Sequence, residues 1–214
     1  MKGPSTFATL AAAALAVTAG GLEGPRDPLF SPAEAIVRFR NNSEPALFVA
    51  AWAKGEVAAQ GRLDTYLAAL SEELGIPARA KRVASGGDVI LAIDMDALNT
   101  RLTSHLRGHP RVVGAVPTNP PGEVTVELAK GSREAQAVEE ARLKKPEGVV
   151  AAPPVVAREL ARGFAFDVTG RITPRGLLVT VDPRAVTLKL VERLRQRPDV
   201  EYAQPNFVMK LGVR

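Results

Sequence analysis

The segment ILAIDMDALNTRLTSHLRGHPRVVGAVPT, residues 90–118, returns later in the chain as LLVTVDPRAVTLKLVERLRQRPDVEYAQPN, residues 177–206. Asp94 falls on Asp182 at an offset of 88 residues, and the two segments align without a gap. Identical pairs include Ala97/Ala185, Leu102/Leu190, Leu106/Leu194, Arg107/Arg195, Pro110/Pro198, Val112/Val200, Ala115/Ala203 and Pro117/Pro205. Self-similarity at a fixed period indicates repeated structural units, so we interpret the chain as two copies of one unit.

The same offset extends towards the N-terminus. It places IVRFR (36–40) on VTVEL (124–128), and both pentapeptides alternate as strands do. It also places Gly75 on Gly163, each at the end of a helical pattern, where glycine commonly ends a helix. Between the copies, Asn119-Pro120-Pro121-Gly122 has the composition of a linker. We therefore expect three parts: a signal peptide with a flexible lead-in (1–33), copy one (34–119) and copy two (120–214).

Each copy predicts the same order of elements: a strand, a helical region broken in its middle, a hairpin of two strands, a helix and a last strand. The expected bounds in copy one are 35–40, about 45–74 with a break at Gly61, 76–84, 88–94, 95–108 and 111–116. Those in copy two are 123–129, about 132–162 with a break at KKPEGVVAAPP (144–154), 164–171, 176–182, 183–197 and 199–204. The order βαββαβ predicts an α+β fold of two tandem ferredoxin-like domains, each with an antiparallel sheet and both helices on one face.

The second helix of each copy has an apolar face and a capping residue. Apolar residues recur at helical spacing at Leu98, Leu102 and Leu106 in copy one, and at Val186, Leu190 and Leu194 in copy two. Asp94 and Asp182 directly precede the two helices, so we expect them to be N-caps rather than catalytic carboxylates.

Composition excludes several kinds of protein. The chain has 214 residues, of which 46% are hydrophobic and 24% charged, which is enough for a core and argues against general disorder. The net charge of +5 is spread along the chain, whereas a nucleic-acid binder concentrates it in a patch. The central strands of copy one lack aromatic residues, and copy two has only Phe164 and Phe166 near its hairpin, so RNA binding by the sheets is not expected. Cysteine is absent, which excludes disulfides and thiolate chemistry.

The first residues have the pattern of a secretory signal. MKGPSTFATLAAAALAVTAGG (1–21) carries one lysine, an apolar run and small residues at Val17-Thr18-Ala19, where cleavage would fit. The run is short for a bilayer span. We therefore expect export to the periplasm or the medium and no membrane partner after cleavage; the alternative is a poorly ordered alanine-rich tail or an N-terminal helix.

No constellation of catalytic residues is apparent, and we expect neither an enzyme nor a cofactor. His105 and His109 share a helix face at the spacing of a metal-binding pair, but no glutamate lies beside His105, and copy two has Arg193 and Arg197 at these positions. We expect this face to be basic and solvated in both copies, with no metal. Ser85-Gly86-Gly87 is expected to form a hairpin turn and not a phosphate-binding loop.

The last thirty residues or so resemble the end of the propeptide of subtilisin-like serine proteases, a peptidase-inhibitor family. The shared pattern is a leucine-bearing helix, a turn such as Pro198-Asp199-Val200, then a motif close to V-x-Y-V-E-P-N/D that continues here as Glu201-Tyr202-Ala203-Gln204-Pro205-Asn206-Phe207-Val208. Residues 110–118 match more loosely, and AIVRFR (35–40) resembles the opening strand of the family.

The resemblance implies a protease inhibitor or folding chaperone. The open face of the sheet would pack on two surface helices of a subtilisin-like protease, and the tail would enter its cleft like a product, as an added strand. The implied protease-binding residues are Glu201, Tyr202, Gln204, Pro205, Asn206, Phe207, Val208, Met209, Lys210, Leu211, Gly212, Val213 and Arg214. Arg214 with Leu211, or Leu211 with Val208, would fill the primary and outer pockets, and both registers stay open.

The sequence departs from the family and leaves alternatives. Gln204 and Asn206 are amides where many members carry acidic residues that face helix N-termini. The protease would act as a partner in trans, or in cis if the chain is a fragment of a precursor. Residues 208–213 could instead extend the last strand and pair with copy one to close the fold. The alternative function is a non-inhibitory exported binding or scaffold module.

Overall fold

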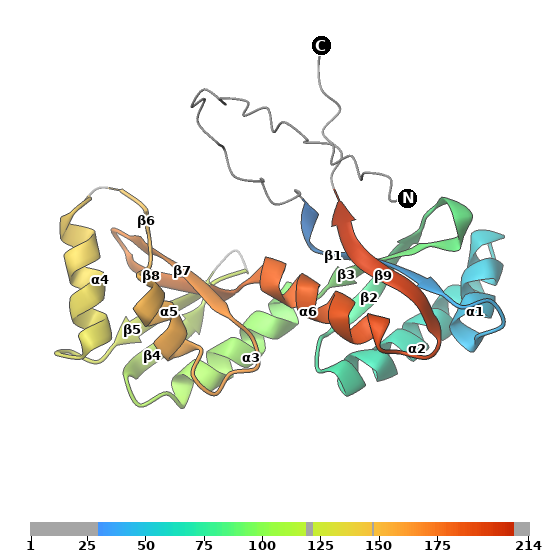
Figure 1. Ribbon diagram of the computed structural model, residues 1–214. Coiled ribbons are helices and arrows are strands. Elements are labelled where there is room, and N and C mark those ends of the chain that lie inside the picture. Colours follow the sequence, from blue (N-terminus) through green and yellow to red (C-terminus); the bar gives the residue numbers. More distant parts are fainter. Residues whose placement is uncertain (1–29, 119–121, 147, 208–214) are drawn as a thin grey trace, which may run out of the picture.

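The computed structural model describes residues 30–118, 122–146 and 148–207, which form a mixed α+β fold with two antiparallel sheets (Figure 1). Sheet A has four strands in the order β2 (Ala78–Val83), β3 (Val89–Ile93), β1 (Phe30–Phe39) and β9 (Val200–Phe207). Sheet B has five in the order β4 (Val112–Pro117), β5 (Val124–Leu128), β8 (Gly176–Val181), β7 (Val168–Thr173) and β6 (Val150–Ala151). The helices are α1 (Glu44–Ala53), α2 (Val57–Leu74), α3 (Met95–Arg107), α4 (Arg133–Leu143), α5 (Pro154–Leu160) and α6 (Pro183–Arg195).

Each sheet takes strands from both repeats, so the expectation that each copy closes its own sheet is not met. β9 of copy two pairs with β1 of copy one, and β4 of copy one pairs with β5 of copy two. Helix α6 packs on β1 and β9, while α3 packs on β4, β5 and β8. The helix–strand pairs α3–β4 and α6–β9 have therefore exchanged places between the two halves of the molecule.

The connection between β4 and β5 explains the exchange. Residues 118–123, which include the linker expected at 119–122, join two neighbouring strands, and the amide of Thr118 donates to the main-chain oxygen of Glu123 at 2.9 Å. A short connection favours a hairpin because it closes at small entropic cost. With β4 held beside β5, the position beside β1 is left for β9. The expected boundary between residues 119 and 120 thus falls within a hairpin of sheet B.

The exchanged helices begin near the centre of the molecule and lead into opposite halves (Figure 1). Asp94 and Asp182 are their N-caps, as predicted: Asp94 accepts from the amide of Ala97, and Asp182 from the amides of Arg184 and Ala185. Each aspartate is the one residue between a strand of one half and a helix of the other. The chain therefore passes from one half of the molecule to the other at equivalent residues of the two repeats.

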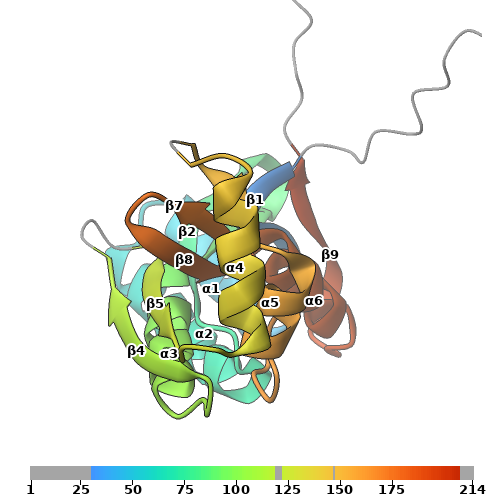
Figure 2. The same cartoon turned by 90° about the vertical axis from the view of Figure 1, so that its left-hand side faces the viewer.

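One connected apolar core runs through both halves. The predicted inner faces of α3 and α6 are buried, with Leu102 fully enclosed and Leu190 1% exposed. Val37 of sheet A and Val126 of sheet B belong to the same cluster. Seen from the end of sheet B, α4 stands in front of the strands and α5 beside it (Figure 2). No helix within the described ranges is both long and apolar enough to cross a bilayer.

Of the two predicted breaks in the helical regions, the first is wrong and the second is confirmed. The first helical region breaks at Lys54–Glu56 and not at Gly61, which lies inside α2, because Gly55 adopts a φ of 91°. In copy two, residues 144–153 do separate α4 from α5, and they also contain the unpredicted β6.

The first strands align at an offset of 89 residues and not 88. Their buried residues are Ala35 and Val37 in β1, and Val124 and Val126 in β5. An error of one residue in a strand exchanges its two faces, so the alternation of IVRFR and VTVEL was aligned on opposite faces of the two sheets.

Candidate functional site

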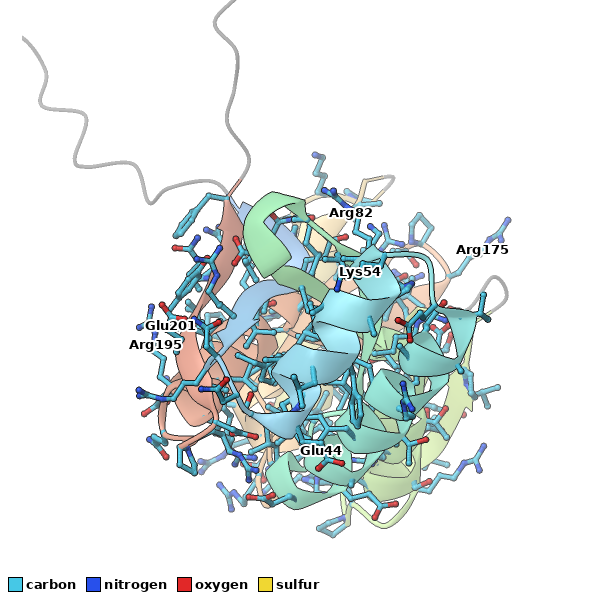
Figure 3. All side chains as sticks on the ribbon, turned by 90° about the vertical axis from the view of Figure 1, so that its right-hand side faces the viewer. Glu44, Lys54, Arg82, Arg175, Arg195 and Glu201 are labelled. Atoms are coloured by element: carbon cyan, nitrogen blue, oxygen red, sulfur yellow. The ribbon has the colours of Figure 1, made fainter. Side chains whose placement is uncertain are left out.

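The predicted protease-binding residues from Glu201 to Phe207 lie in β9, one of the two edge strands of sheet A. Tyr202 pairs with Arg38 and Gln204 with Ile36, so this part of the motif is held against copy one. A register irregularity between Arg38 and Phe39 accommodates Glu201, which is exposed along the rim formed by β9 and α6 (Figure 3). The predicted contacts Val208 to Arg214 lie outside the described residues.

Tyr202 is fixed on the open face of sheet A, which the helices do not cover. Its hydroxyl donates to Asp88 Oδ1 at 2.6 Å, and Arg38 Nε donates to the same oxygen at 2.8 Å. The Arg38 guanidinium also lies 5.2 Å from the centre of the Tyr202 ring, within the range of a cation–π contact. The hydrogen bond to Asp88, and after it burial, raises the pKa of Tyr202. These contacts orient the tyrosine ring before any partner binds.

Asn206 belongs to a second cluster of hydrogen-bonded polar side chains on this face. Its Nδ2 donates to Glu34 Oε2 at 2.7 Å, and Lys81 Nζ forms an ion pair of 2.5 Å with Glu34 Oε1. The hydrogen bond from Lys81 lowers the pKa of Glu34, although burial opposes this shift. The carboxylate of Glu34 therefore lies beside the amide of Asn206, at the position where many members of the resembled family carry an acidic residue.

Of the remaining described residues of the motif, some are buried and stabilise sheet A, and others are exposed at its edge. Ala203 is 1% exposed in the core, and its main-chain oxygen accepts from Arg195 Nε at 2.8 Å. Pro205 is buried, whereas Phe207, at the end of the strand, is 43% exposed. β9 thus combines an inner side that closes sheet A with polar residues on the open face.

The histidine face is packed and not solvated, contrary to prediction. His109 is only 8% exposed, and its Nδ1 accepts from the amide of Arg111 at 3.3 Å. His105 lies against Phe164 with ring centres 5.2 Å apart. The equivalent arginines also cover a helix end: Arg193 donates to the main-chain oxygen of Leu74, and Arg197 bonds Glu73. Within the described part of the chain, no three acidic or histidine side chains converge on a metal position.

A buried carboxylate lies near this face. Glu134 of α4 is 3% exposed, and its Oε1 accepts from the Arg111 guanidinium at 2.6 Å. Its Oε2 is buried and has no hydrogen-bond partner among the described residues. The hydrogen bond from Arg111 lowers the pKa of Glu134 more than burial raises it. The pair ties the residue just before β4, in copy one, to α4 of copy two.

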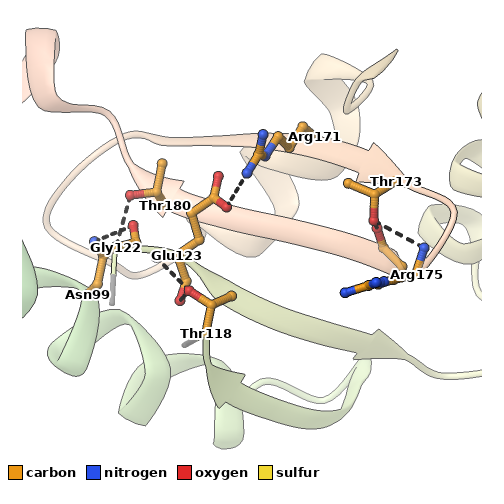
Figure 4. Close-up of polar contacts among 9 residues, drawn as sticks. Asn99, Thr118, Gly122, Glu123, Arg171, Thr173, Arg175 and Thr180 are labelled. Carbon is orange, nitrogen blue, oxygen red and sulfur yellow. Dashed lines mark hydrogen bonds and ion pairs between the residues drawn. The ribbon is translucent and has the colours of Figure 1, made fainter. Parts of the chain in front are cut away.

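A groove of about 780 Å³ lies on the open face of sheet B, and Figure 4 shows polar side chains that line it. It crosses four strands and the β7–β8 turn, and is lined by Pro117, Thr118, Gly122, Glu123, Thr125, Arg171, Thr173, Pro174, Arg175 and Leu178. The sequence did not indicate this site, because its residues come from separate segments and each looks like an ordinary surface residue of a strand or turn.

Asn99 of α3 fixes one end of the groove. Its Nδ2 donates to the main-chain oxygen of Gly122 at 3.0 Å, and its Oδ1 accepts from the amide of Val181 at 3.0 Å and from Thr180 Oγ1 at 3.1 Å (Figure 4). Asn99 is 5% exposed. A helix of copy one therefore holds the groove wall in place in a sheet made mostly from copy two.

Comparison with family models, curated proteins and solved structures finds no match for this chain.

Proposed function

We propose that the chain is a non-enzymatic inhibitor or folding chaperone of a subtilisin-like serine protease, and that it docks through the open face of sheet A. The observation that carries the proposal is the position of β9. The strand that bears the propeptide-like motif is an edge strand of its sheet, with Tyr202 and Asn206 on the face not covered by the described helices. An outer strand offers main-chain groups to an extended partner.

The strand order supports the finer description of the fold. Sheet A reads β2-β3-β1-β9, which corresponds to a ferredoxin-like unit of copy one completed by the last strand of copy two. Sheet B reads β4-β5-β8-β7 with β6 added. We propose that the molecule is a pair of ferredoxin-like units with exchanged α3–β4 and α6–β9 segments, and that only the unit of sheet A carries the inhibitory tail.

The arrangement gives copy one a role in binding. Arg38, Asp88 and Glu34 of copy one surround Tyr202 and Asn206 of copy two. The carboxylates of Glu34 and Asp88 would face the N-termini of protease helices, which stabilise negative charge. In the proposed complex, copy one supplies the acidic groups that Gln204 and Asn206 of β9 do not provide. Export, by a signal peptide in residues 1–21, is part of the same proposal.

A proline scan of residues 208–213 tests the proposal. In a β-strand the N–H groups of alternate residues point to the same side, and proline removes one donor. Protein of residues 25–214 is incubated with a panel of subtilisin-like proteases, and the initial rate of peptide hydrolysis is recorded. Two triple-proline variants are compared, one at Val208, Lys210 and Gly212 and the other at Met209, Leu211 and Val213. We expect one set to abolish inhibition and the other to weaken it less, which also gives the register of the tail.

Two further variants distinguish a loss of inhibition caused by the tail from one caused by unfolding. Removing residues 208–214 is expected to abolish inhibition and leave the melting temperature unchanged, whereas Val116→Thr on the outer strand of sheet B is expected to change neither. A folded protein that inhibits none of the proteases would contradict the proposal.

The groove of sheet B favours a second candidate, an exported binding module without inhibitory activity. In that case removal of residues 208–214 would leave binding of its ligand intact.

A further inference from the structure

We propose that the groove on the open face of sheet B binds a small organic monoanion whose carboxylate lies next to an apolar group, such as an N-acylated apolar amino acid. This site lies on the sheet that does not contain β9, so the proposal does not depend on protease binding. The argument rests on the shape, charge and rigidity of the groove.

Two guanidinium groups reach over the groove. Arg171 extends from β7, and Arg175 extends from the β7–β8 turn back over the strands (Figure 4). Arg171 is 50% exposed and forms an ion pair of 2.7 Å with Glu123. The Arg175 side chain has no carboxylate within ion-pair distance in the part of the chain that the structure describes. Two positive groups against one negative group leave a net charge that one carboxylate would neutralise, and guanidinium binds carboxylate through paired hydrogen bonds.

The other residues of the groove could contact a ligand that has an apolar group next to an amide. Leu178 is half-buried between the flanking strands, and Pro117 and Pro174 lie at the two ends. Thr125 offers a hydroxyl group, which can both donate and accept hydrogen bonds. An apolar surface with a few convergent polar groups is typical of small-molecule sites. The volume of about 780 Å³ exceeds what an inorganic anion fills.

The walls of the groove are held in position without a ligand. Asn99 anchors Gly122, and Thr118 Oγ1 donates to the main-chain oxygen of Glu123 at 3.1 Å. On the opposite side the amide of Arg175 donates to Thr173 Oγ1 at 3.2 Å, which fixes the turn. A preformed site loses less conformational freedom on binding. Asn99 is thus a positioning residue for the groove and not a ligand contact.

The test compares two probes that differ only in charge. N-acetyl-leucine and its amide are titrated into the full chain, with binding measured by calorimetry and by the methyl NMR signals of Leu178 and Thr125. We expect the carboxylate to bind and to shift these signals, and the amide to bind at least about tenfold more weakly, because it lacks the charge-assisted hydrogen bonds. Equal binding of both probes would overturn the proposal.

Three variants locate the site. Arg175→Gln removes an exposed guanidinium and is expected to weaken binding of N-acetyl-leucine about tenfold. Arg82→Gln makes the same change of charge on β2 of sheet A, away from the groove, and is the matched control (Figure 3). Glu123→Gln removes the carboxylate that competes for Arg171, so we expect tighter binding.

Inorganic phosphate distinguishes the proposed ligand from a simple anion. We expect phosphate to compete weakly, because it does not use Leu178 or the two prolines. Phosphate that binds as tightly as N-acetyl-leucine would show a non-specific anion site and overturn the proposal. The same conclusion would follow if Arg82→Gln weakened binding as much as Arg175→Gln, or if Glu123→Gln left it unchanged.

Discussion

The amide of Arg40, at the end of β1, donates a hydrogen bond of 2.8 Å to the main-chain oxygen of Asp199, just before β9. The bond joins copy one to copy two. In the other half, the amide of Ala129 donates to the main-chain oxygen of Arg111 at 2.9 Å, from copy two to copy one. The exchange of segments is therefore repeated at equivalent positions in both halves, and neither half contains only one copy.

The first prediction concerns this interlocking. A protease site is inserted between residues 118 and 122 of the full chain, and the chain is then cut there. We expect the two pieces to stay together on size exclusion at neutral pH, because each sheet contains strands of both. We also expect them to separate only when denaturant unfolds the sheets.

Separation of the cut pieces into two folded proteins without denaturant would contradict the exchange. It would show that each repeat closes its own sheet, as we first expected. The uncut protein with the same insertion is the control for the effect of the insertion itself.

The second prediction concerns Asn99. Asn99→Ala leaves the amide of Val181 and the main-chain oxygen of Gly122 without their hydrogen bonds in a buried place, so we expect unfolding to be easier by about 2 kcal/mol. Thr100→Ala removes only an exposed hydroxyl that donates to the main-chain oxygen of Asp96 on the same helix, and should cost less than about 0.5 kcal/mol. Denaturant titration measures both. Equal effects would show that the hydrogen bonds of Asn99 do not hold copy one to copy two.

Local patterns predicted the elements because each pattern depends on neighbouring residues. The caps at Asp94 and Asp182, and the buried faces with Leu102 and Leu190, follow from spacing alone. The spacing of residues does not predict which strands β4 and β9, the last strands of the two copies, pair with. β4 and β9 share the residues Val112/Val200 and Ala115/Ala203, so either strand fits either sheet edge.

What selects the partner is the length of the connection between β4 and β5, which a linker-like composition obscured. In the candidate site, the motif up to Gln204 could be located from sequence, because it lies in the last strand predicted at 199–204, whereas the continuation of β9 to Phe207 was not predicted. Its partners Asp88 and Glu34 could not, because they come from copy one. The groove of sheet B depends wholly on which strands are neighbours, and that was the relationship the sequence left open.

The third prediction concerns pH and Glu134. Arg111 lowers the pKa of this carboxyl in the folded protein, so the pair stabilises the fold above the usual pKa of 4.5, and this contribution is lost as the pH falls through the lowered value. We expect Glu134→Gln to reduce the melting temperature at pH 7 and to make its fall in acid less steep. Glu140→Gln, an exposed position on the same helix, should leave the acid slope unchanged. Parallel curves for wild type and Glu134→Gln would contradict this role.

The fourth prediction concerns Gly61, where the sequence suggested a break and the structure has continuous helix. A Cβ added there would meet nothing within 4 Å. Alanine in an exposed helix interior is more stable than glycine by about 0.5–1 kcal/mol, because the unfolded chain loses less freedom on folding. We therefore expect Gly61→Ala to raise the free energy of unfolding by about this amount. Gly131 is the contrasting position, since its φ of 77° disfavours a side chain and Gly131→Ala should destabilise. If Gly61→Ala destabilised as Gly131→Ala does, α2 would be broken at Gly61, and Leu63 and Leu67 would no longer continue the helix that covers sheet A.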